Sequence, residues 1–227
     1  MSESLINEAN AGFTLAEAIA EANRCLNCAV PQCKKHCPIS NDIPDWIHEF
    51  ARGNFGNAMS IVNAKSNLPA VCGRVCAHER QCEGNCILGK KGAPVRIGKL
   101  ERFLADFDSE MGVSHDRLVP KTRGKVAVIG SGPAGLTVAG ELARRGFEVD
   151  IYEMETSAGG VLMFGIPEYR LPKAVVSREI KKITELGVRI NCGVTIGQDM
   201  TIDDLFAKGY DAIFMLSLIH ISEPTRR

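Results

Sequence analysis

Apolar positions follow two different periods along the chain, and the change of period divides it in two. In the first part they recur every three or four residues, which is typical of helices that bury one face. The clearest stripe falls within 96–107 and consists of Ile97, Leu100, Phe103, Leu104 and Phe107. Glu101 lies at the edge of this stripe, close enough to point inward. From 124 to 215 short apolar runs alternate with longer amphipathic segments, which predicts strands and helices in turn.

Local signals predict where the first helices begin and end. Thr14 followed by Glu17 is a capping box, in which each side chain satisfies a backbone N–H group of the other residue. The segment 43–53 predicts the next helix, with Pro44 in its first turn and Gly53 at its close. Further helices are predicted over about 55–65 and 96–107.

The segment 125–153 predicts a strand, a glycine-rich turn, a helix and a second strand, in that order. The turn has the pattern G-x-G-x-x-G. Its glycines allow a tight turn, close approach of the backbone to a pyrophosphate, and close packing of the helix on the strand. The turn consists of Gly130, Ser131, Gly132, Pro133, Ala134 and Gly135. Glu153, at the end of the second strand, can accept a hydrogen bond from a ribose hydroxyl. The sequence therefore predicts a dinucleotide site, with FAD and NAD(P) both open.

A helix over 201–207 and a strand over 208–215 are predicted to follow. Between these elements and the glycine turn lies Cys192, in the strand-like run 188–194. A lone cysteine in such a run is predicted to be a small core residue rather than a metal ligand.

Composition narrows the class of protein. Hydrophobic residues make up 45% of the 227 residues, and 27 acidic residues balance 27 basic ones, so the formal net charge is zero. This balance gives no argument for nucleic acid or an anionic membrane surface as a partner. The first ten residues lack the basic and apolar regions of a secretory signal, and no apolar run is long enough to span a membrane. A cytoplasmic protein is therefore expected, in a compartment where disulfides are rare.

Eight of the nine cysteines lie between 25 and 86, in two groups. The first group is Cys25, Cys28, Cys33 and Cys37, followed by Pro38, and the second is Cys72, Cys76, Cys82 and Cys86. Disulfides, zinc and iron–sulfur clusters are the candidate chemistries. Zinc sites usually pair two C-x2-C knuckles, whereas only one such knuckle is present here, and neither His36 nor His78 has ligand spacing. Three close cysteines followed by a Cys-Pro are typical of bacterial ferredoxins, so two 4Fe–4S clusters are predicted, with zinc as the alternative.

Three further segments extend the pattern: 68–76 (LPAVCGRVC), 86–103 (CILGKKGAPVRIGKLERF) and 158–173 (AGGVLMFGIPEYRLPK). With the cysteine groups and the glycine turn, they resemble one family over roughly 15–215. That family contains the small subunit of NADPH-dependent glutamate synthase, the flavin subunit of NADH-dependent ferredoxin–NADP oxidoreductase, and the N-terminal part of dihydropyrimidine dehydrogenase. The resemblance implies FAD at the glycine turn. It places the adenosine ribose on Glu153, and Gly160, Val161 and Arg170 along the flavin.

The resemblance also implies how two clusters would be bound. One would use Cys25, Cys28, Cys33 and Cys86. The other would use Cys37, Cys76, Cys82 and Glu101, at a position where a relative carries glutamine. Cys72 would then be a bystander, although spacing alone leaves Cys72 and Glu101 both open as the eighth ligand.

The function implied by the resemblance is electron transfer from NAD(P)H through FAD and the clusters to a partner. The favoured interpretation is a glutamate synthase small subunit, which with a large subunit makes glutamate from glutamine and 2-oxoglutarate. The alternatives are a flavin subunit of a ferredoxin–NADP transhydrogenase and a non-enzymatic iron–sulfur relay or docking module. No side chain has the neighbours of a nucleophile or general base, so no catalytic residue is predicted.

The expected organisation is a helical domain with two 4Fe–4S clusters over 1–115, followed over 116–215 by the first part of a Rossmann-type FAD-binding domain. The NADPH site of the family would lie beyond this sequence, which makes the chain a fragment. Residues 216–227 have no place in this fold. Codons that encode Leu216–Arg226 resemble a transposon adapter used to prepare sequencing libraries, so this tail is predicted to be non-native.

Overall fold

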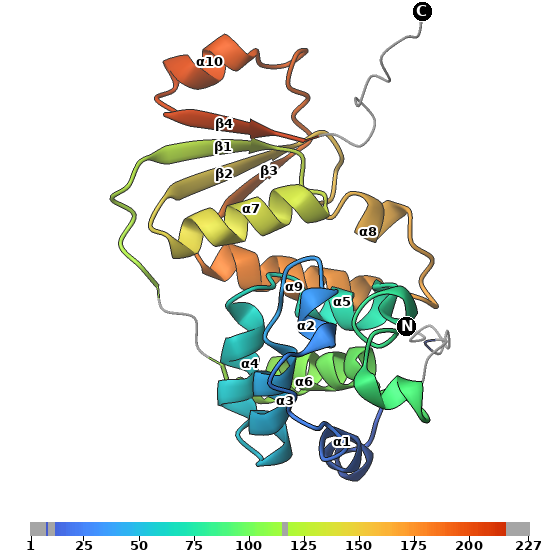
Figure 1. The fold of residues 1–227 in the computed structure, drawn as a ribbon. Coiled ribbons are helices and arrows are strands. Elements are labelled where there is room, and N and C mark those ends of the chain that lie inside the picture. The colour runs from blue at the N-terminus through green and yellow to red at the C-terminus, as the bar shows by residue number, and fades with distance from the viewer. Residues whose placement is uncertain (1–7, 9–11, 115–117, 217–227) are drawn as a thin grey trace, which may run out of the picture. The chain divides into compact units, whose positions relative to one another are not determined.

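The computed structural model describes residues 8, 12–114 and 118–216, and the chain forms two compact units (Figure 1). The first, here called the helical unit, consists of Met1–Asp116 and Pro167–Glu179. The second, here called the sheet unit, consists of Arg117–Ile166 and Ile180–Arg227. The segment Pro167–Glu179 thus follows the glycine turn in sequence but belongs to the helical unit. The predicted domain boundaries at 115 and 215 stay a prediction.

The helical unit is built from short helices joined by the cysteine loops. They are α1 (Leu15–Ala22), α2 (Gln32–Lys35), α3 (Ile43–Ala51), α4 (Phe55–Asn63), α5 (Pro69–Val75), α6 (Ile97–Met111) and the 3₁₀ turns η1 (His78–Arg80) and η2 (Ile87–Lys90). The first part of α9 (Lys173–Glu185) also belongs to this unit.

The predicted helix boundaries are confirmed at several places. The Thr14 backbone N–H donates to Glu17 Oε2 at 2.8 Å, and the Glu17 N–H donates back to Thr14 Oγ1 at 3.3 Å. Pro44 lies in the first turn of α3, and Gly53 follows that helix with φ +81°, a conformation that glycine adopts without strain. Helix α6 extends four residues past the predicted end at 107, to Met111, and Gly112 is its C-cap.

The core of the helical unit lies between α3, α4 and α6. Its largest fully buried side chains are Trp46, Ile47, Phe50, Met59, Leu100 and Leu104. The predicted stripe of α6 thus supplies part of this core. The Phe50 ring packs edge to face against Phe55, with ring centroids 5.0 Å apart, an arrangement that aromatic pairs favour.

The sheet unit is a four-stranded parallel sheet in the order β3-β2-β1-β4. Its elements are β1 (Lys125–Ile129), α7 (Pro133–Arg144), β2 (Glu148–Glu153), α8 (Val161–Phe164), β3 (Arg189–Cys192), α10 (Ile202–Ala207) and β4 (Ala212–Met215). Helix α7 packs on β1 and β2, as a right-handed crossover between parallel strands requires. The glycine turn therefore lies where β1 ends and α7 begins, the usual ligand position in a doubly wound sheet.

One sequence prediction is contradicted by the structure, and another is not tested by it. Cys192 was predicted to be a core residue, and this is wrong, because it ends the edge strand β3 and is exposed. The predicted non-native tail lies outside the described residues except for Leu216. No helix in the described part of the chain is long and apolar enough to cross a membrane.

Candidate functional site

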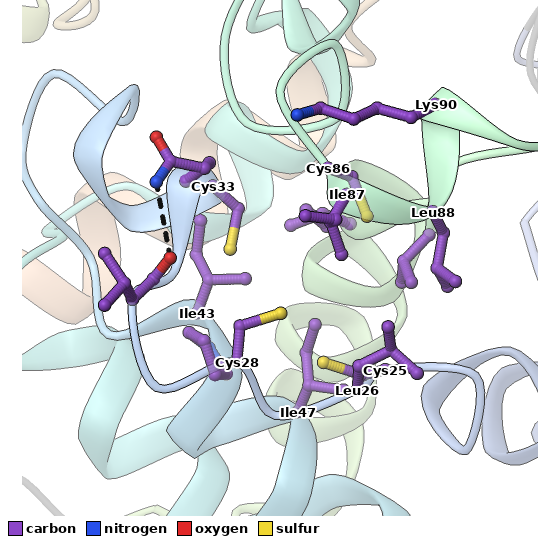
Figure 2. A pocket seen from close by; sticks show the side chains of 15 residues that line it. Cys25, Leu26, Cys28, Cys33, Ile43, Ile47, Cys86, Ile87, Leu88 and Lys90 are labelled. Atoms are coloured by element: carbon purple, nitrogen blue, oxygen red, sulfur yellow. Dashed lines mark hydrogen bonds between the residues drawn. The ribbon is translucent and has the colours of Figure 1, made fainter.

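Three cysteines that are close in sequence and a distant fourth line one pocket of about 190 Å³ in the helical unit (Figure 2). Cys25 and Cys28 lie in the loop after α1, Cys33 lies in α2, and Cys86 caps η2. Figure 2 shows their sulfur atoms pointing toward the same space. These residues are the first group predicted from the family resemblance, and they are here called the first thiol group.

The rest of the pocket wall is mostly apolar. Ile43, Ile47, Val95 and Ile97 are almost fully buried behind the cysteines, while Leu26, Val30 and Ile87 are exposed at its edge. Burial raises the pKa of the Cys25 thiol and raises that of Cys33 to about 11. Burial is the largest cause of both shifts, and the neighbouring thiols make a smaller contribution to them, because thiolates repel one another. Such thiols stay protonated at neutral pH until a cation replaces the protons.

Arg24 connects the two loops that carry these cysteines. Its guanidinium donates to the Ala93 carbonyl at 2.5 Å and, more weakly, to the Pro94 carbonyl at 3.4 Å. It also pairs with Glu21 of α1 at 2.6 Å. The loop that follows Cys25 therefore lies beside the segment that follows Cys86, although they are far apart in the sequence.

A second set of candidate ligands lies elsewhere in the helical unit and is here called the second ligand group: Cys37, Cys76, Cys82 and Glu101. Cys76 caps the end of α5, Cys82 follows η1, Cys37 follows α2, and Glu101 lies on α6. The pKa of the Cys82 thiol is raised to about 12, mainly by burial and to a smaller extent by the charges of Glu101, Glu83 and Cys37. The structure thus brings the predicted members of this group into one electrostatic neighbourhood.

Cys72 is close to this group as well. Its thiol interacts with Cys76, which raises the Cys72 pKa well above the usual value and lowers that of Cys76. The Ser66 hydroxyl lies 3.8 Å from the Cys72 sulfur. Burial raises the pKa of the Glu101 carboxyl well above its usual value, and Cys72 and Glu179 raise it further. Both candidates for the eighth ligand are therefore near Cys76, and the geometry leaves both open.

The donor set suits an iron–sulfur cluster. All nine cysteines are free thiols. Within residues 8, 12–114 and 118–216, no three His, Cys, Asp or Glu side chains lie close enough together to hold a single metal ion. A 4Fe–4S cluster takes its thiolates at separate iron corners rather than at one point. Four thiols around one mostly apolar pocket therefore fit such a cluster.

The glycine turn of the sheet unit has the geometry of a pyrophosphate loop. Gly130 has φ +92°, and a Cβ on Gly135 would lie 2.0 Å from the Gly130 carbonyl oxygen, so neither position accepts a side chain. A Cβ on Gly132 would point into open space, and Gly132 is the residue that caps α7. The N–H groups at the start of α7 are thus accessible to a phosphate.

Glu153 organises this loop. Its Oε2 accepts from the Ser131 N–H at 2.7 Å and from the Ser131 hydroxyl, while Oε1 accepts from the Glu155 N–H at 2.9 Å. The Ser131 hydroxyl oxygen in turn accepts from the Gly159 N–H at 3.0 Å. The sequence analysis did not predict a role for Gly159. Its place next to Gly160, as one of two adjacent glycines, was the signal that could have indicated it. Glu153 is therefore both a loop-ordering residue and a candidate ribose acceptor.

The other predicted flavin residues divide between the two units. A Cβ on Gly160 would lie 2.9 Å from the Gly132 Cα, so this part of the chain packs against the glycine turn. Val161 begins α8 and is 43% exposed. Arg170 belongs to the helical unit, and its predicted role stays a prediction.

Comparison with known protein families found one model that matches mainly the helical unit and one that matches mainly the sheet unit. The family model described as dihydropyrimidine dehydrogenase domain II, 4Fe-4S cluster, matches residues 2–113, and the model of an NAD(P)-binding Rossmann-like domain matches 128–172. The predicted fold class, a helical iron–sulfur domain followed by a Rossmann-like sheet, is thereby confirmed.

Three curated relatives cover most of this chain. The glutamate synthase (NADPH) small chain of Escherichia coli (strain K12) is 39% identical over 204 residues, which are 89% of this chain and 43% of the relative. The NAD-dependent dihydropyrimidine dehydrogenase subunit PreT of the same strain is 38% identical over 216 residues, 95% of this chain and 52% of the relative. The putative oxidoreductase UacF, also from that strain, is 41% identical over 207 residues, 90% of this chain and 32% of the relative.

This chain therefore spans about half of these relatives' length or less, and it matches them along nearly all of its own. The two family models match the parts of the chain that contain the cysteine groups and the glycine turn. The chain belongs to the oxidoreductase family that contains the glutamate synthase small chains and the PreT subunits.

Proposed function

We propose that this chain is the cluster-bearing and flavin-binding part of an oxidoreductase that passes electrons between NAD(P)H, FAD and two 4Fe–4S clusters to a partner subunit. The observation that carries the proposal is the first thiol group, in which four cysteines from two distant loops line one mostly apolar pocket. Such a pocket limits water access to a bound cluster, which is one way a protein sets a cluster's potential.

In this proposal the first thiol group binds one cluster. The second ligand group binds the other, with Glu101 in the position of the eighth ligand. A carboxylate is a harder ligand than a thiolate, so the second cluster would differ from the first in potential. Glu101 is half-buried and its surroundings raise the pKa of its carboxyl, which supports a role inside the protein rather than at a solvated surface.

The sheet unit would hold FAD, which on binding supplies the change from two-electron hydride chemistry to single-electron transfer. The N–H groups at the start of α7 would bind the pyrophosphate. Glu153 would accept from the adenosine ribose while it keeps Ser131 and the loop in place. Gly160 and Val161 would line the flavin side, together with Arg170. These residues bind and orient, and no proton-transferring side chain is assigned.

The electron acceptor belongs to another chain. We favour a glutamate synthase large subunit, which would make this chain part of a cytoplasmic enzyme that forms glutamate from glutamine and 2-oxoglutarate. The PreT relative is as similar as the glutamate synthase relative, at 38% against 39% identity, so pyrimidine reduction is a second candidate. A ferredoxin–NADP transhydrogenase subunit and a non-enzymatic relay are the remaining alternatives.

Anaerobic reconstitution of the chain with iron and sulfide tests the core of the proposal. We expect about eight iron and eight sulfide per chain, as two 4Fe–4S clusters require, and an EPR signal after reduction. Uptake of zinc in preference to iron, with no visible absorption after reconstitution, would contradict it.

Flavin binding is tested separately by Gly132→Val in the gene product with all of its domains. A side chain at this position would enter the space where the pyrophosphate is proposed to approach the backbone. We expect FAD to be lost and the iron content to stay, because every proposed cluster ligand lies in the helical unit. Retention of stoichiometric FAD would refute the assignment of this loop.

A further inference from the structure

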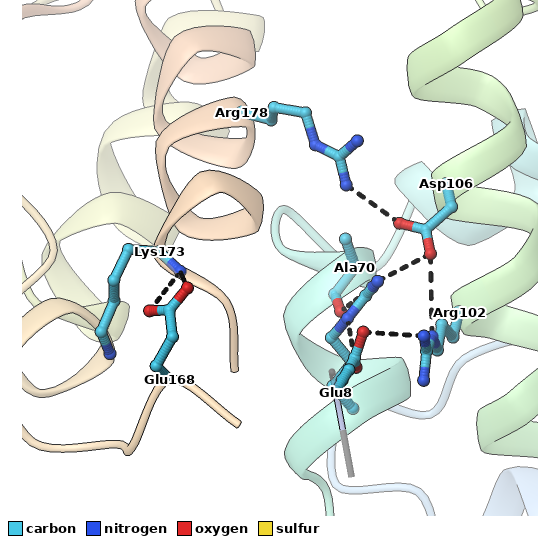
Figure 3. A network of polar contacts seen from close by, with 8 residues as sticks. Glu8, Ala70, Arg102, Asp106, Glu168, Lys173 and Arg178 are labelled. Carbon is cyan, nitrogen blue, oxygen red and sulfur yellow. Dashed lines mark hydrogen bonds and ion pairs between the residues drawn. The ribbon is translucent and has the colours of Figure 1, made fainter. Parts of the chain in front are cut away.

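Arg74, on the short helix α5, forms hydrogen bonds to Glu8, Ala70 and Asp106, which Figure 3 labels in a polar network of the helical unit. Its side chain is only 4% exposed. It donates to Glu8 Oε1 at 2.9 Å and to Asp106 Oδ2 at 2.7 Å. A third bond reaches the Ala70 carbonyl at 3.1 Å, one turn back on α5. One guanidinium therefore joins α5 to α6 and to the N-terminal segment.

Two other arginines complete the network. Arg102 on α6 donates to Glu8 Oε2 at 2.7 Å, so the Glu8 carboxylate is held by two guanidinium groups. Arg178 on α9 donates to Asp106 Oδ1 at 3.1 Å. A buried arginine that loses its carboxylates is left as an uncompensated charge, which disfavours the packed arrangement strongly. The network is therefore a constraint on how α5 lies against α6, and not a set of solvated surface pairs.

Helices α5 and α6 approach each other at the backbone. A Cβ on Gly73 would lie 2.5 Å from the Arg102 backbone nitrogen and 2.8 Å from its Cα. No layer of interlocking side chains separates the helices at this point. The relative position of the two helices therefore depends on the ion pairs beside this contact. Arg74 is the most buried of the three arginines in these ion pairs.

The same two helices carry candidate ligands of the second cluster. Helix α5 contains Cys72 and ends at Cys76, and α6 contains Glu101, the neighbour of Arg102 in sequence. A helix of seven residues is not stable by itself, so tertiary contacts decide where Cys76 lies. We infer that Arg74 is a positioning residue for the second cluster: through Glu8 and Asp106 it holds α5 against α6 so that Cys76 and Glu101 can bind the same cluster.

This inference rests on the proposed function, and the first cluster serves as an internal control. None of the network residues lines the pocket of the first thiol group. A change in the network should therefore affect the second cluster and leave the first cluster in place.

The experiment compares Arg74→Gln, Arg74→Lys and Asp106→Asn with the unchanged chain after anaerobic reconstitution. Iron content, EPR spectra and the midpoint potential of each cluster are measured. Arg145→Gln is the control, since Arg145 forms an exposed i,i+4 pair with Glu141 on α7 in the sheet unit. In Arg74→Gln we expect iron to fall toward half, with the loss confined to the second cluster, and a shifted potential for any second cluster that remains.

Arg74→Lys should restore part of the second cluster, because an ammonium keeps the charge but cannot span both carboxylates as a guanidinium does. Asp106→Asn, which keeps the shape of the side chain, should show a weaker form of the same selective loss. Absence of clusters from the unchanged chain would refute the proposed function itself. If the unchanged chain carries both clusters, the inference would be refuted by an Arg74→Gln variant that keeps both clusters with unaltered spectra and potentials. Equal loss of both clusters in Arg74→Gln and Asp106→Asn would also refute it.

Discussion

The first thiol group and the second ligand group lie in one small helical unit, yet they are built in different ways. The first consists of four thiols, two on the loop after α1, one in the short helix α2 and one at the start of η2, around a pocket whose wall is mostly aliphatic. The second consists of three thiols and a carboxylate. Glu101 lies on α6 and Cys76 caps α5, and ion pairs between arginines and carboxylates join these two helices. Apolar packing shapes the first group, whereas ion pairs and backbone contact shape the second.

The difference bears on how each group would accept metal. Each group contains a thiol whose pKa is raised, mainly by burial: to about 11 for Cys33 and to about 12 for Cys82. Cluster assembly must therefore displace protons in either place. In the second group Glu101 adds a further acid whose pKa is raised by burial. The two groups thus each contain a thiol of raised pKa and differ in ligand chemistry, which is the property that tunes cluster potential.

The strongest test of the comparison removes one thiol from each group. Cys33→Ala should abolish the first cluster alone and Cys82→Ala the second alone, because three remaining thiols leave one iron corner unbound. Iron content and EPR of the reduced protein measure both effects, with a fall to about half of the iron in each case. Cys192→Ala is the matched control, since Cys192 is exposed on the edge strand of the sheet unit. If Cys33→Ala and Cys82→Ala gave the same spectrum, the division into two groups would be wrong.

A second test asks which residue completes the second group. Glu101→Ala should reduce the second cluster severalfold or change its potential, whereas Cys72→Ala should leave its amount and potential unaltered. Glu101→Cys should restore the cluster with a potential closer to that of the first. Potentiometric titration followed by EPR separates these outcomes. Loss of a cluster in Cys72→Ala together with no change in Glu101→Ala would reverse the ligand assignment.

A third test concerns the apolar wall that distinguishes the first group. Ile47 is 1% exposed and lies between the pocket and the core of the helical unit. Ile47→Ala should lower the free energy of unfolding by about 2–5 kcal/mol, because it removes buried methyl groups and leaves a cavity. Val30 lines the same pocket but is 59% exposed, so Val30→Ala should cost less than about 0.5 kcal/mol. Chemical denaturation of the metal-free chain measures both losses of unfolding free energy. If Ile47→Ala cost no more than Val30→Ala, packing of the buried wall would not contribute to stability.

The sequence predicted the regular parts of the molecule well. The capping box at Thr14, the strand 125–129 and the glycine turn each follow from short-range rules, in which residues a few positions apart decide the local structure. The prediction for Cys192 failed because burial of a strand depends on its place in the sheet, and an edge position cannot be read from an apolar run.

The rest of the candidate site depends on contacts between distant segments. Spacing predicted clusters, but nothing local to Cys86 indicated that it would lie with Cys25, Cys28 and Cys33, and only the family resemblance supplied that pairing. The network around Arg74 was not predicted at all. Its carboxylates and its fellow arginines come from the N-terminal segment, α6 and α9, and no local pattern links these segments. Long-range pairing of charges is decided by tertiary packing, which a single sequence does not display.

The smallest effect is expected where an ion pair contributes to the first group. Arg24 joins the loops around this pocket through the Ala93 carbonyl and Glu21, but 39% of its side chain is exposed. Solvent screens such a contact, so Arg24→Gln should cost about 0.2–1 kcal/mol of unfolding free energy. Its effect on the first cluster should be a slower assembly rather than a loss, because the aliphatic wall still holds the loops. Arg24→Lys controls for charge, since it keeps the cation without the planar fork that reaches two acceptors. Stopped-flow absorbance during reconstitution, compared with denaturation midpoints, measures both quantities. A complete loss of the first cluster in Arg24→Gln would show that polar contacts hold this group as they hold the second, and the contrast between the two groups would be wrong.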